Sequence, residues 1–262
     1  MSVDKPHKRR QLRELPVRSL APNILTVLAL CAGLTAVRFA LGDKFEFAAL
    51  AILVAAVLDG LDGRVARLLK GETRFGAELD SLTDFVNFGI VPGMMLYLWS
   101  LQDAGGLGWV AVLAYCVCCG LRLARFNVGM DDIEDRPLWA ANYFVGVPSP
   151  AGALIVMLPL ALYFAGFTLI RDLHFLVVPY TFLAAFLFVS RIPTYSFKRL
   201  RVRRDLVLPI LILVALLSAV LVTNPWETIA GITLIYMASL PFSALSFKKR
   251  EEEEAAKANL EG

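Results

Sequence analysis

The stretch EFAALAILVAAVLDGLDGRVARLL, residues 46–69, decides the fold of this 262-residue chain. It is long enough to cross a bilayer, because a transmembrane helix needs about 20 predominantly apolar residues. Its second half nevertheless carries the charged residues Asp59, Asp62, Arg64 and Arg67. A charged side chain at the centre of a membrane helix costs about 2.5–3.5 kcal/mol on insertion scales. A helix that keeps four of them predicts a functional site inside a membrane protein.

The composition extends this interpretation to the whole chain. Hydrophobic residues make up 58% of it and charged residues 19%, whereas soluble domains average about 45–50% and roughly 25%. These values exclude an ordinary soluble globule and a disordered chain. We expect an all-α polytopic bundle of about eight transmembrane helices, with six as the alternative because two apolar runs are short. The runs span residues 22–41, 46–69, 76–101, 106–126, 147–168, 174–190, 206–223 and 227–247.

The basic residues support an even number of spans. If the N-terminus is cytoplasmic, one side of the membrane receives 23 of the 26 Lys and Arg residues. This asymmetry follows the positive-inside rule and predicts that both termini are cytoplasmic. The segments on that side are 1–21, 64–74, 122–136, 191–204 and 248–257, and Arg38, Lys44 and Arg171 fall on the other side.

Charge also divides the chain into three parts. Residues 1–21 form a basic N-terminal segment, in which apolar residues interleave with basic ones between residues 6 and 20. This pattern predicts an amphipathic helix on the membrane surface, with a disordered basic tail as the alternative. Residues 22–247 form the membrane domain, and residues 248–262 form a charged cytoplasmic tail.

Helical spacing brings four aspartates together. Asp59 and Asp62 are three residues apart and share one helix face, and Asp80 and Asp84, four apart, share another. Only a short loop, residues 70–75, separates the two helices, so they pack as antiparallel neighbours and the two faces can meet. We therefore expect one carboxylate cluster near the cytoplasmic ends of these helices.

Four carboxylates at close quarters need counter-charge. Hard oxygen ligands suit Mg²⁺, Mn²⁺ or Ca²⁺, and two such ions would stabilise both the attacking and the leaving oxygen of a phosphoryl displacement. Gly63 and Gly76 would let a ligand approach the backbone closely. Two alternatives stay open, namely a structural salt-bridge network with Arg64 and Arg67, and the ion pathway of a cation transporter.

The same residues match a known signature. The pattern D-x2-D-G-x2-A-R-x8-G-x3-D-x3-D resembles that of the CDP-alcohol phosphotransferase family, and this sequence fills it without a departure. Eight fixed residues over 26 positions make the match highly specific. The residues that fill it are Asp59, Asp62, Gly63, Ala66, Arg67, Gly76, Asp80 and Asp84.

The resemblance implies an integral membrane enzyme that displaces CMP from a CDP-linked lipid with an alcohol. It implies that the four aspartates bind two divalent cations, Mg²⁺ or Mn²⁺ with Ca²⁺ as a further occupant. Asp84 would also be the general base, with Asp80 beside it at the reacting centre. A homodimer is implied as well, and no nucleic acid is expected as a partner. Contacts with the CDP-lipid are implied for Asn23, Thr26, Gly63, Ala66, Arg67, Thr73 and Gly76.

Two further segments bear on the acceptor alcohol. Residues 120–127, GLRLARFN, and 144–151, FVGVPSPA, resemble the bacterial and archaeal phosphatidylserine synthases within this family. The resemblance implies CDP-diacylglycerol and L-serine as substrates, CMP as a product, and a site near the cytoplasmic leaflet of a bacterial inner membrane. Candidates for holding the serine carboxylate or a lipid phosphate are Arg122, Arg125, Asn127 and Arg191, although the positive-inside rule alone also accounts for these arginines.

Other acceptors stay open, namely choline, glycerol 3-phosphate and an inositol phosphate. A phosphorylated acceptor would need a denser basic pocket. Choline would need an aromatic cage, for which Phe126, Trp139, Tyr143 and Phe144 are available. A cation transporter would use the same aspartates without the nucleotide contacts.

Overall fold

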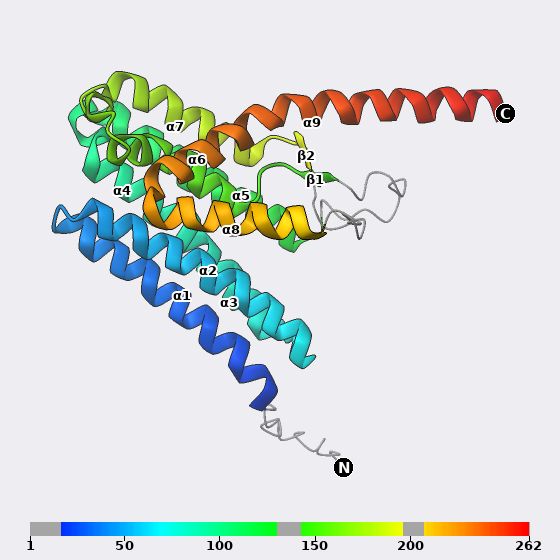
Figure 1. Cartoon of the computed structure of the whole chain (residues 1–262), viewed down its shortest axis with the longest axis horizontal. Coiled ribbons are helices and arrows are strands. Elements are labelled where there is room, and N and C mark those ends of the chain that lie inside the picture. Colours follow the sequence, from blue (N-terminus) through cyan, green and yellow to red (C-terminus); the bar gives the residue numbers. More distant parts are fainter. Residues whose placement is uncertain (1–16, 130–142, 196–206, 262) are drawn as a thin grey trace, which may run out of the picture.

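The computed structural model describes residues 17–129, 143–195 and 207–261, and they form a helical bundle (Figure 1). Each of the eight apolar runs is helical, which confirms the predicted fold class. The helices are α1 (Val17–Leu41), α2 (Phe45–Leu69), α3 (Arg74–Asp84), η1 (Phe85–Ile90), α4 (Val91–Trp99), η2 (Leu101–Ala104), α5 (Gly106–Asn127), α6 (Ser149–Phe164), η4 (Thr168–Arg171), α7 (His174–Val189), α8 (Val207–Thr223) and α9 (Pro225–Glu261).

Helix length bears on the number of spans. Among the described residues, three helices are both long and apolar enough to cross a bilayer, and they lie in α1, α5 and α9. α6 and α7 have 16 residues each, which at about 1.5 Å per residue is shorter than a hydrocarbon core of about 30 Å. The count of eight spans therefore stays a prediction.

α1 and α2 form an antiparallel hairpin that lies along one side of the molecule (Figure 1). Small residues at the contact let the two backbones approach closely. Ala36 on α1 and Ala48 and Ala55 on α2 have no exposed surface. This hairpin holds the first half of the aspartate cluster.

α3, η1 and α4 follow one another without a break, where a single helix over residues 76–101 was expected. η1 is a π-helix, a form in which the hydrogen-bond ladder is widened by one residue. Pro92 lies in the first turn of α4 and cannot donate to the Phe88 carbonyl. The Tyr115 hydroxyl of α5 donates to that carbonyl instead, at 2.7 Å. Asp84 therefore lies directly before an irregular turn that a neighbouring helix stabilises.

Beside the helices, two short strands that the sequence did not predict pair in an antiparallel ribbon. β1 (Tyr143–Val145) pairs with β2 (Pro193–Tyr195), in the register Tyr143 to Tyr195. The Thr194 hydroxyl donates to the Gly146 carbonyl at 3.0 Å. Three-residue strands are too short to show the alternating pattern that identifies a strand in a sequence. The ribbon ties the start of α6 to the end of α7.

The core lies between η1, α4, α5, α6 and α7. Trp99, Tyr115, Phe88 and Phe188 are the largest fully buried side chains. The rings of Tyr115 and Phe188 lie 5.2 Å apart, which joins α5 to α7. α9 packs against α6 and β2 on the outside of this core.

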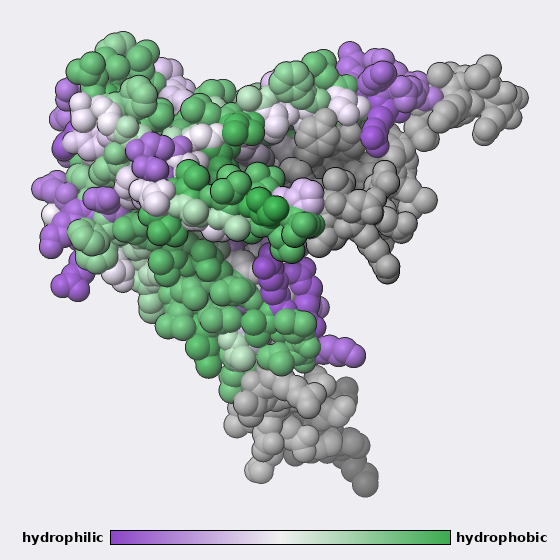
Figure 2. Space-filling model, viewed as in Figure 1, coloured by the Kyte–Doolittle hydropathy of each residue, from purple (hydrophilic) through white to green (hydrophobic). Residues whose placement is uncertain are grey.

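The outer surface of the helices is apolar. Every side chain of α8 from residue 208 to residue 223 is exposed, and the helix has no polar face. Figure 2 shows hydrophobic residues over α8 and over the α1–α2 hairpin, with hydrophilic residues near the helix ends. A helix that is apolar all round needs an apolar environment, and a lipid bilayer supplies one.

The structure describes the C-terminal tail but only the end of the N-terminal segment. Residues 1–16, which hold most of the predicted surface helix, lie outside the described residues, and α1 already begins at Val17. The charged tail is part of α9, which runs to Glu261 and extends away from the other helices (Figure 1). Lys248 pairs with Glu252 across one helical turn, with nitrogen and oxygen 4.0 Å apart.

Candidate active site

The turn between α2 and α3 is built by two helix caps. Lys70 adopts a left-handed conformation (φ 50°) and Gly71 donates to the Ala66 carbonyl at 3.0 Å, which closes α2. Thr73 then caps α3, because its hydroxyl accepts a hydrogen bond from the Gly76 amide at 3.0 Å. This short connection sets the last turns of α2 beside the first turns of α3.

The four aspartates meet across this helix pair, as their spacing predicts. One carboxylate oxygen from each of Asp59, Asp62 and Asp80 lies within 4.8 Å of the other two. Asp84 lies close enough to Asp59 for the two carboxyl groups to interact directly. The cluster therefore contains all four of the predicted carboxylates.

Asp62 is fixed by α1. Only 4% of Asp62 and 3% of Thr26 are exposed, and the Thr26 hydroxyl donates to Asp62 Oδ2 at 2.6 Å. Thr26 was expected to contact the nucleotide. Its hydroxyl orients one of the carboxylates, and its expected contact with the nucleotide stays a prediction.

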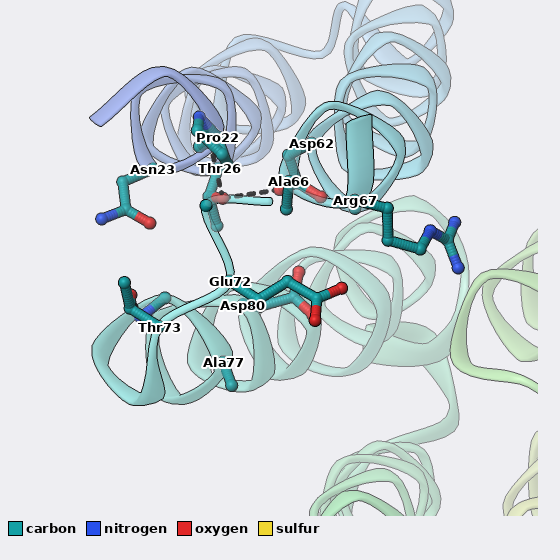
Figure 3. Close-up of a pocket in the computed structure, with 13 residues that line it drawn as sticks. Pro22, Asn23, Thr26, Asp62, Ala66, Arg67, Glu72, Thr73, Ala77 and Asp80 are labelled. Atoms are coloured by element: carbon teal, nitrogen blue, oxygen red, sulfur yellow. Dashed lines mark hydrogen bonds between the residues drawn. The ribbon is translucent and has the colours of Figure 1, made fainter. Parts of the chain in front are cut away.

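A pocket of about 340 Å³ opens beside the aspartates, between α1, α2 and α3 (Figure 3). Asp62 and Asp80 form part of its wall. All seven residues expected to contact the CDP-lipid also line it, namely Asn23, Thr26, Gly63, Ala66, Arg67, Thr73 and Gly76. The structure thus brings together in one cavity residues that lie on three helices.

Four residues of the pocket were not predicted, namely Pro22, Gly71, Glu72 and Ala77. None of them occupies a fixed position of the family pattern. Pro22, Glu72 and Ala77 each neighbour a predicted residue, and Gly71 lies in the short loop over residues 70–75. Glu72 adds a carboxylate to the loop between the two helix caps.

Two glycines of the pocket, Gly63 and Gly76, differ in how much space surrounds them. A Cβ atom added at Gly76 would lie 2.8 Å from Asn23 Oδ1 and 3.2 Å from Thr73 Oγ1, so Gly76 allows α1 and α3 to meet. A Cβ atom at Gly63 would meet no atom within 4 Å. Packing therefore does not require glycine at position 63, which leaves room there for a ligand.

The carboxylates fit a divalent metal centre. Asp59 Oδ1 and Asp84 Oδ1 are buried and have no hydrogen-bond partner among the described residues. Buried polar atoms are costly unless they are paired, and a cation would pair them. Because the donors are all carboxylate oxygens, the set suits a hard cation such as Mg²⁺ or Mn²⁺.

The salt-bridge alternative is not supported within the described part of the chain. Arg64 and Arg67 are both exposed. Neither forms an ion pair with the aspartates among the described residues. The two arginines therefore do not neutralise the cluster in this structure.

The four acceptor candidates divide by position. Arg122 interacts electrostatically with Asp84 and donates from Nη1 to the Ser149 hydroxyl. Arg125 donates to the Val189 carbonyl at 3.1 Å and so ties α5 to α7. Asn127, at the end of α5, exchanges hydrogen bonds of 3.0 and 3.1 Å with Ser81 of α3. Arg191 is exposed beyond the end of α7.

The described aromatic residues that were available for a choline cage lie on two separate elements. Phe126 is 65% exposed, and it lies at the end of α5. Tyr143 and Phe144 lie in β1. Trp139 falls outside the described residues, so its position is not compared.

Comparison with known proteins places this site in a family. The model of the CDP-alcohol phosphatidyltransferase family matches residues 19–190, and a second one, CDP-alcohol phosphatidyltransferase 2, matches residues 205–241. The first match covers the aspartates and the whole pocket.

Curated relatives match most of the chain. It is 41% identical over 244 residues to a protein of Mycobacterium leprae, covering 92% of this chain and 78% of the relative. It is 40% identical over 248 residues to a protein of Mycobacterium tuberculosis, with 93% and 83% covered. A Helicobacter pylori protein is 30% identical over 220 residues, with 83% and 89% covered. All three relatives are named CDP-diacylglycerol–serine O-phosphatidyltransferase.

The helices, the aspartate cluster and these matches all indicate the same family of membrane proteins. The family match covers well over half of the chain, and its relatives align over nearly all of the described helices. The chain is therefore an integral membrane protein that belongs to the CDP-alcohol phosphatidyltransferase family.

Proposed function

We propose that this protein transfers the phosphatidyl group of CDP-diacylglycerol to L-serine and so forms phosphatidylserine and CMP. The observation that carries the proposal is the pocket, because residues expected to hold a CDP-lipid line the same cavity as two aspartates of the carboxylate cluster. The names of relatives that align over most of the chain support serine as the acceptor.

The cofactor of this reaction is a pair of divalent cations, Mg²⁺ or Mn²⁺. Asp59, Asp62, Asp80 and Asp84 would hold them, and the orphaned oxygens of Asp59 and Asp84 support this assignment. When bound, such ions neutralise the charge of the pyrophosphate.

The other side chains of the site accept the proton and bind the two substrates. The serine hydroxyl attacks the phosphorus that carries diacylglycerol, and a new P–O bond forms as the P–O bond to CMP breaks. Asp84 accepts the hydroxyl proton. Arg67 offers paired donors to a phosphate, and Asn23 and Thr73 hold the nucleotide. Arg122, which interacts with Asp84, pairs with the serine carboxylate.

The position of the pocket suits a substrate that is half lipid and half nucleotide. Leu68, Phe75 and Leu82 are large, apolar and more than 60% exposed on α2 and α3, so they offer a surface to acyl chains. Lys70 and Arg74 are exposed at the turn between these helices, as in a cytoplasmic segment. We place the site at the cytoplasmic leaflet of a bacterial membrane, with both chain termini in the cytoplasm.

The test is a CMP-release assay on the purified full-length protein with CDP-diacylglycerol and Mn²⁺. The acceptors offered in turn are L-serine, choline, glycerol 3-phosphate and inositol phosphate. We expect release with L-serine alone, a loss of about 100-fold or more in Asp84→Asn, and wild-type activity in the control Asp103→Asn, an exposed aspartate of η2. Release with a different acceptor would overturn serine and keep the reaction class.

The same assay separates an enzyme from a cation transporter. Arg67→Ala removes a phosphate donor and leaves the carboxylates in place. An enzyme should lose CDP-diacylglycerol turnover in this variant. A transporter should keep its cation flux into vesicles, and the absence of CMP release with every acceptor would favour that function.

A further inference from the structure

The loop between α2 and α3 places one further carboxylate at the pocket. Glu72 lies between Lys70, which ends α2, and Thr73, which caps α3. It lines the same cavity as Asp80. Figure 3 shows its side chain extending from the loop in the direction of Asp80. Position 72 is not fixed in the family pattern, and the proposed reaction assigns this carboxylate no task.

The Glu72 carboxylate is available to a ligand. It is exposed, and within the described part of the chain it takes part in no hydrogen bond or ion pair. Two cationic residues, Lys70 and Arg74, lie two positions before and after it, yet neither pairs with it there. The turn is closed instead by its backbone and by the Thr73 hydroxyl. The fold therefore does not require a carboxylate at position 72.

Glu72 is also separate from the metal-binding carboxylates. Among the described residues, the acidic groups whose oxygens lie within 4.8 Å of one another are Asp59, Asp62 and Asp80. Glu72 is not a member of this group. A carboxylate that lines the pocket without binding a cation would repel a pyrophosphate. Glu72 should therefore face a part of the substrate that is uncharged and offers hydrogen-bond donors.

The pocket suggests which part this is. Asn23 and Thr73 meet over Gly76, because a Cβ atom there would lie 2.8 Å from Asn23 Oδ1 and 3.2 Å from Thr73 Oγ1. Gly76 precedes Asp80 by one helical turn, about 6 Å along α3. In a CDP-lipid the ribose lies between the pyrophosphate and the base. A pyrophosphate at the metal centre beside Asp80, with the base near Asn23 and Thr73, puts the ribose in the stretch over which Glu72 extends (Figure 3).

We propose that Glu72 is a specificity-determining residue that binds the ribose of the CDP-lipid, its carboxylate accepting hydrogen bonds from the 2′- and 3′-hydroxyls. The inference rests on the proposed function for the identity of the donor and does not depend on the acceptor. A vicinal diol offers two neighbouring O–H donors, and a carboxylate offers two acceptor oxygens and no donor. An acidic residue holds the ribose 2′-hydroxyl in dinucleotide-binding folds by the same chemistry.

This arrangement selects a ribonucleotide donor over a 2′-deoxyribonucleotide. Hydrogen bonds to a charged group are about twice as strong as those between neutral groups. A site built to bond a substrate hydroxyl strongly rejects an analogue that lacks it. Glu72 should therefore affect the KM for the donor and the preference for ribose, and should leave the KM for L-serine unchanged.

The experiment measures release of CMP or dCMP by the full-length protein at saturating L-serine and Mn²⁺. The donor that is varied is CDP-diacylglycerol or its 2′-deoxy analogue, dCDP-diacylglycerol. In wild type the KM for the deoxy donor should be about tenfold higher, as expected for the loss of one hydrogen bond to a charged group. Glu72→Ala should raise the KM for CDP-diacylglycerol at least tenfold and bring the two KM values within twofold of each other.

Two further variants serve as matched comparisons. Glu72→Gln keeps the size of the side chain and one acceptor oxygen, so its preference for ribose should lie between those of wild type and Glu72→Ala. Glu78→Ala removes an exposed glutamate of α3 that is not part of the pocket lining. This control should keep both KM values of wild type.

The outcomes separate this inference from the proposed function. If wild type has equal KM values for the two donors, or if its preference survives in Glu72→Ala, the role of Glu72 is wrong and the function stands. A lower KM for CDP-diacylglycerol in Glu72→Ala would show that the carboxylate only repels the pyrophosphate, and would also overturn the inference. So would a gain of UDP-diacylglycerol turnover in Glu72→Ala with an unchanged preference for ribose, because the carboxylate would then bind the cytosine amino group. If wild type releases nucleotide from neither donor with any acceptor, both the function and the inference fall.

Discussion

Single side chains decide how the carboxylates of this site are held. Thr26 lines the pocket, and its hydroxyl also donates to Asp62 at 2.6 Å, with both residues almost fully buried. A group that orients a metal-binding carboxylate typically changes metal affinity by 10–100-fold when it is removed. The sequence places Thr26 near the site, but it does not reveal which of its neighbours the hydroxyl bonds.

Thr26→Val should therefore raise the Mn²⁺ concentration that gives half-maximal activity about tenfold. Valine keeps the shape of threonine and removes the donor. The matched control is Thr35→Val on the same helix, because the Thr35 hydroxyl is exposed and bonds the Cys31 carbonyl of its own turn. An unchanged Mn²⁺ dependence in Thr26→Val would contradict the orienting role.

Gly76 is the second residue whose size matters. A methyl group there would lie 2.8 Å from Asn23 Oδ1 and 3.2 Å from Thr73 Oγ1, so Gly76→Ala should displace these two pocket side chains. We expect the KM for CDP-diacylglycerol to rise at least tenfold. Gly60→Ala is the control, because a Cβ atom there meets nothing within 4 Å, and activity like that of the control in Gly76→Ala would refute the close approach.

At the scale of elements, the irregular turn after Asp84 depends on a hydrogen bond from another helix. Pro92 leaves the Phe88 carbonyl without its usual donor, and the Tyr115 hydroxyl replaces it at 2.7 Å. Tyr115 is completely buried. The π-helix thus owes its stability to α5 as much as to its own residues.

Tyr115→Phe should lower the free energy of unfolding by about 1–3 kcal/mol, because it leaves a buried carbonyl unsatisfied. Thermal unfolding of the purified protein in detergent would show this as a lower Tm. Tyr97→Phe is the matched control, since the Tyr97 hydroxyl makes no hydrogen bond within the described residues and its ring packs on Trp109. Equal Tm values for the two variants would argue against the role of Tyr115.

The elements also show what a sequence can predict. The positions of Asp59, Asp62, Asp80 and Asp84 follow from helical spacing and one short loop, both of which are local and periodic. Most residues of the CDP-lipid pocket followed from the resemblance to the family. By contrast, the π-helix depends on Tyr115, which lies 27 residues from its partner, and no local pattern encodes that contact.

The acceptor candidates show the same limit. Arg122 and Arg125 are alike in the sequence, both at the end of one apolar run. The structure places Arg122 near Asp84 and gives Arg125 the Val189 carbonyl, a choice that depends on the positions of α6 and α7.

For the whole molecule, the distribution of charge predicts its orientation. If all eight apolar runs span the membrane, the basic residues at alternate turns predict that the two termini and the site lie on one side. With the native cysteines replaced by alanine, Asp103→Cys in η2 should react with a membrane-impermeant maleimide in intact cells. Lys249→Cys in α9 should react only after permeabilisation, and its labelling in intact cells would contradict this topology.

The account as a whole depends on one claim, that the aspartate cluster between α2 and α3 is a divalent-metal centre that drives transfer from a CDP-lipid. The most direct measurement is a Mn²⁺ titration of CMP release, with L-serine as acceptor, in protein stripped with EDTA. The account predicts no release without metal, full recovery as Mn²⁺ is added, and no recovery in Asp59→Asn. CMP release that continues in excess EDTA, or that recovers fully in Asp59→Asn, would contradict it.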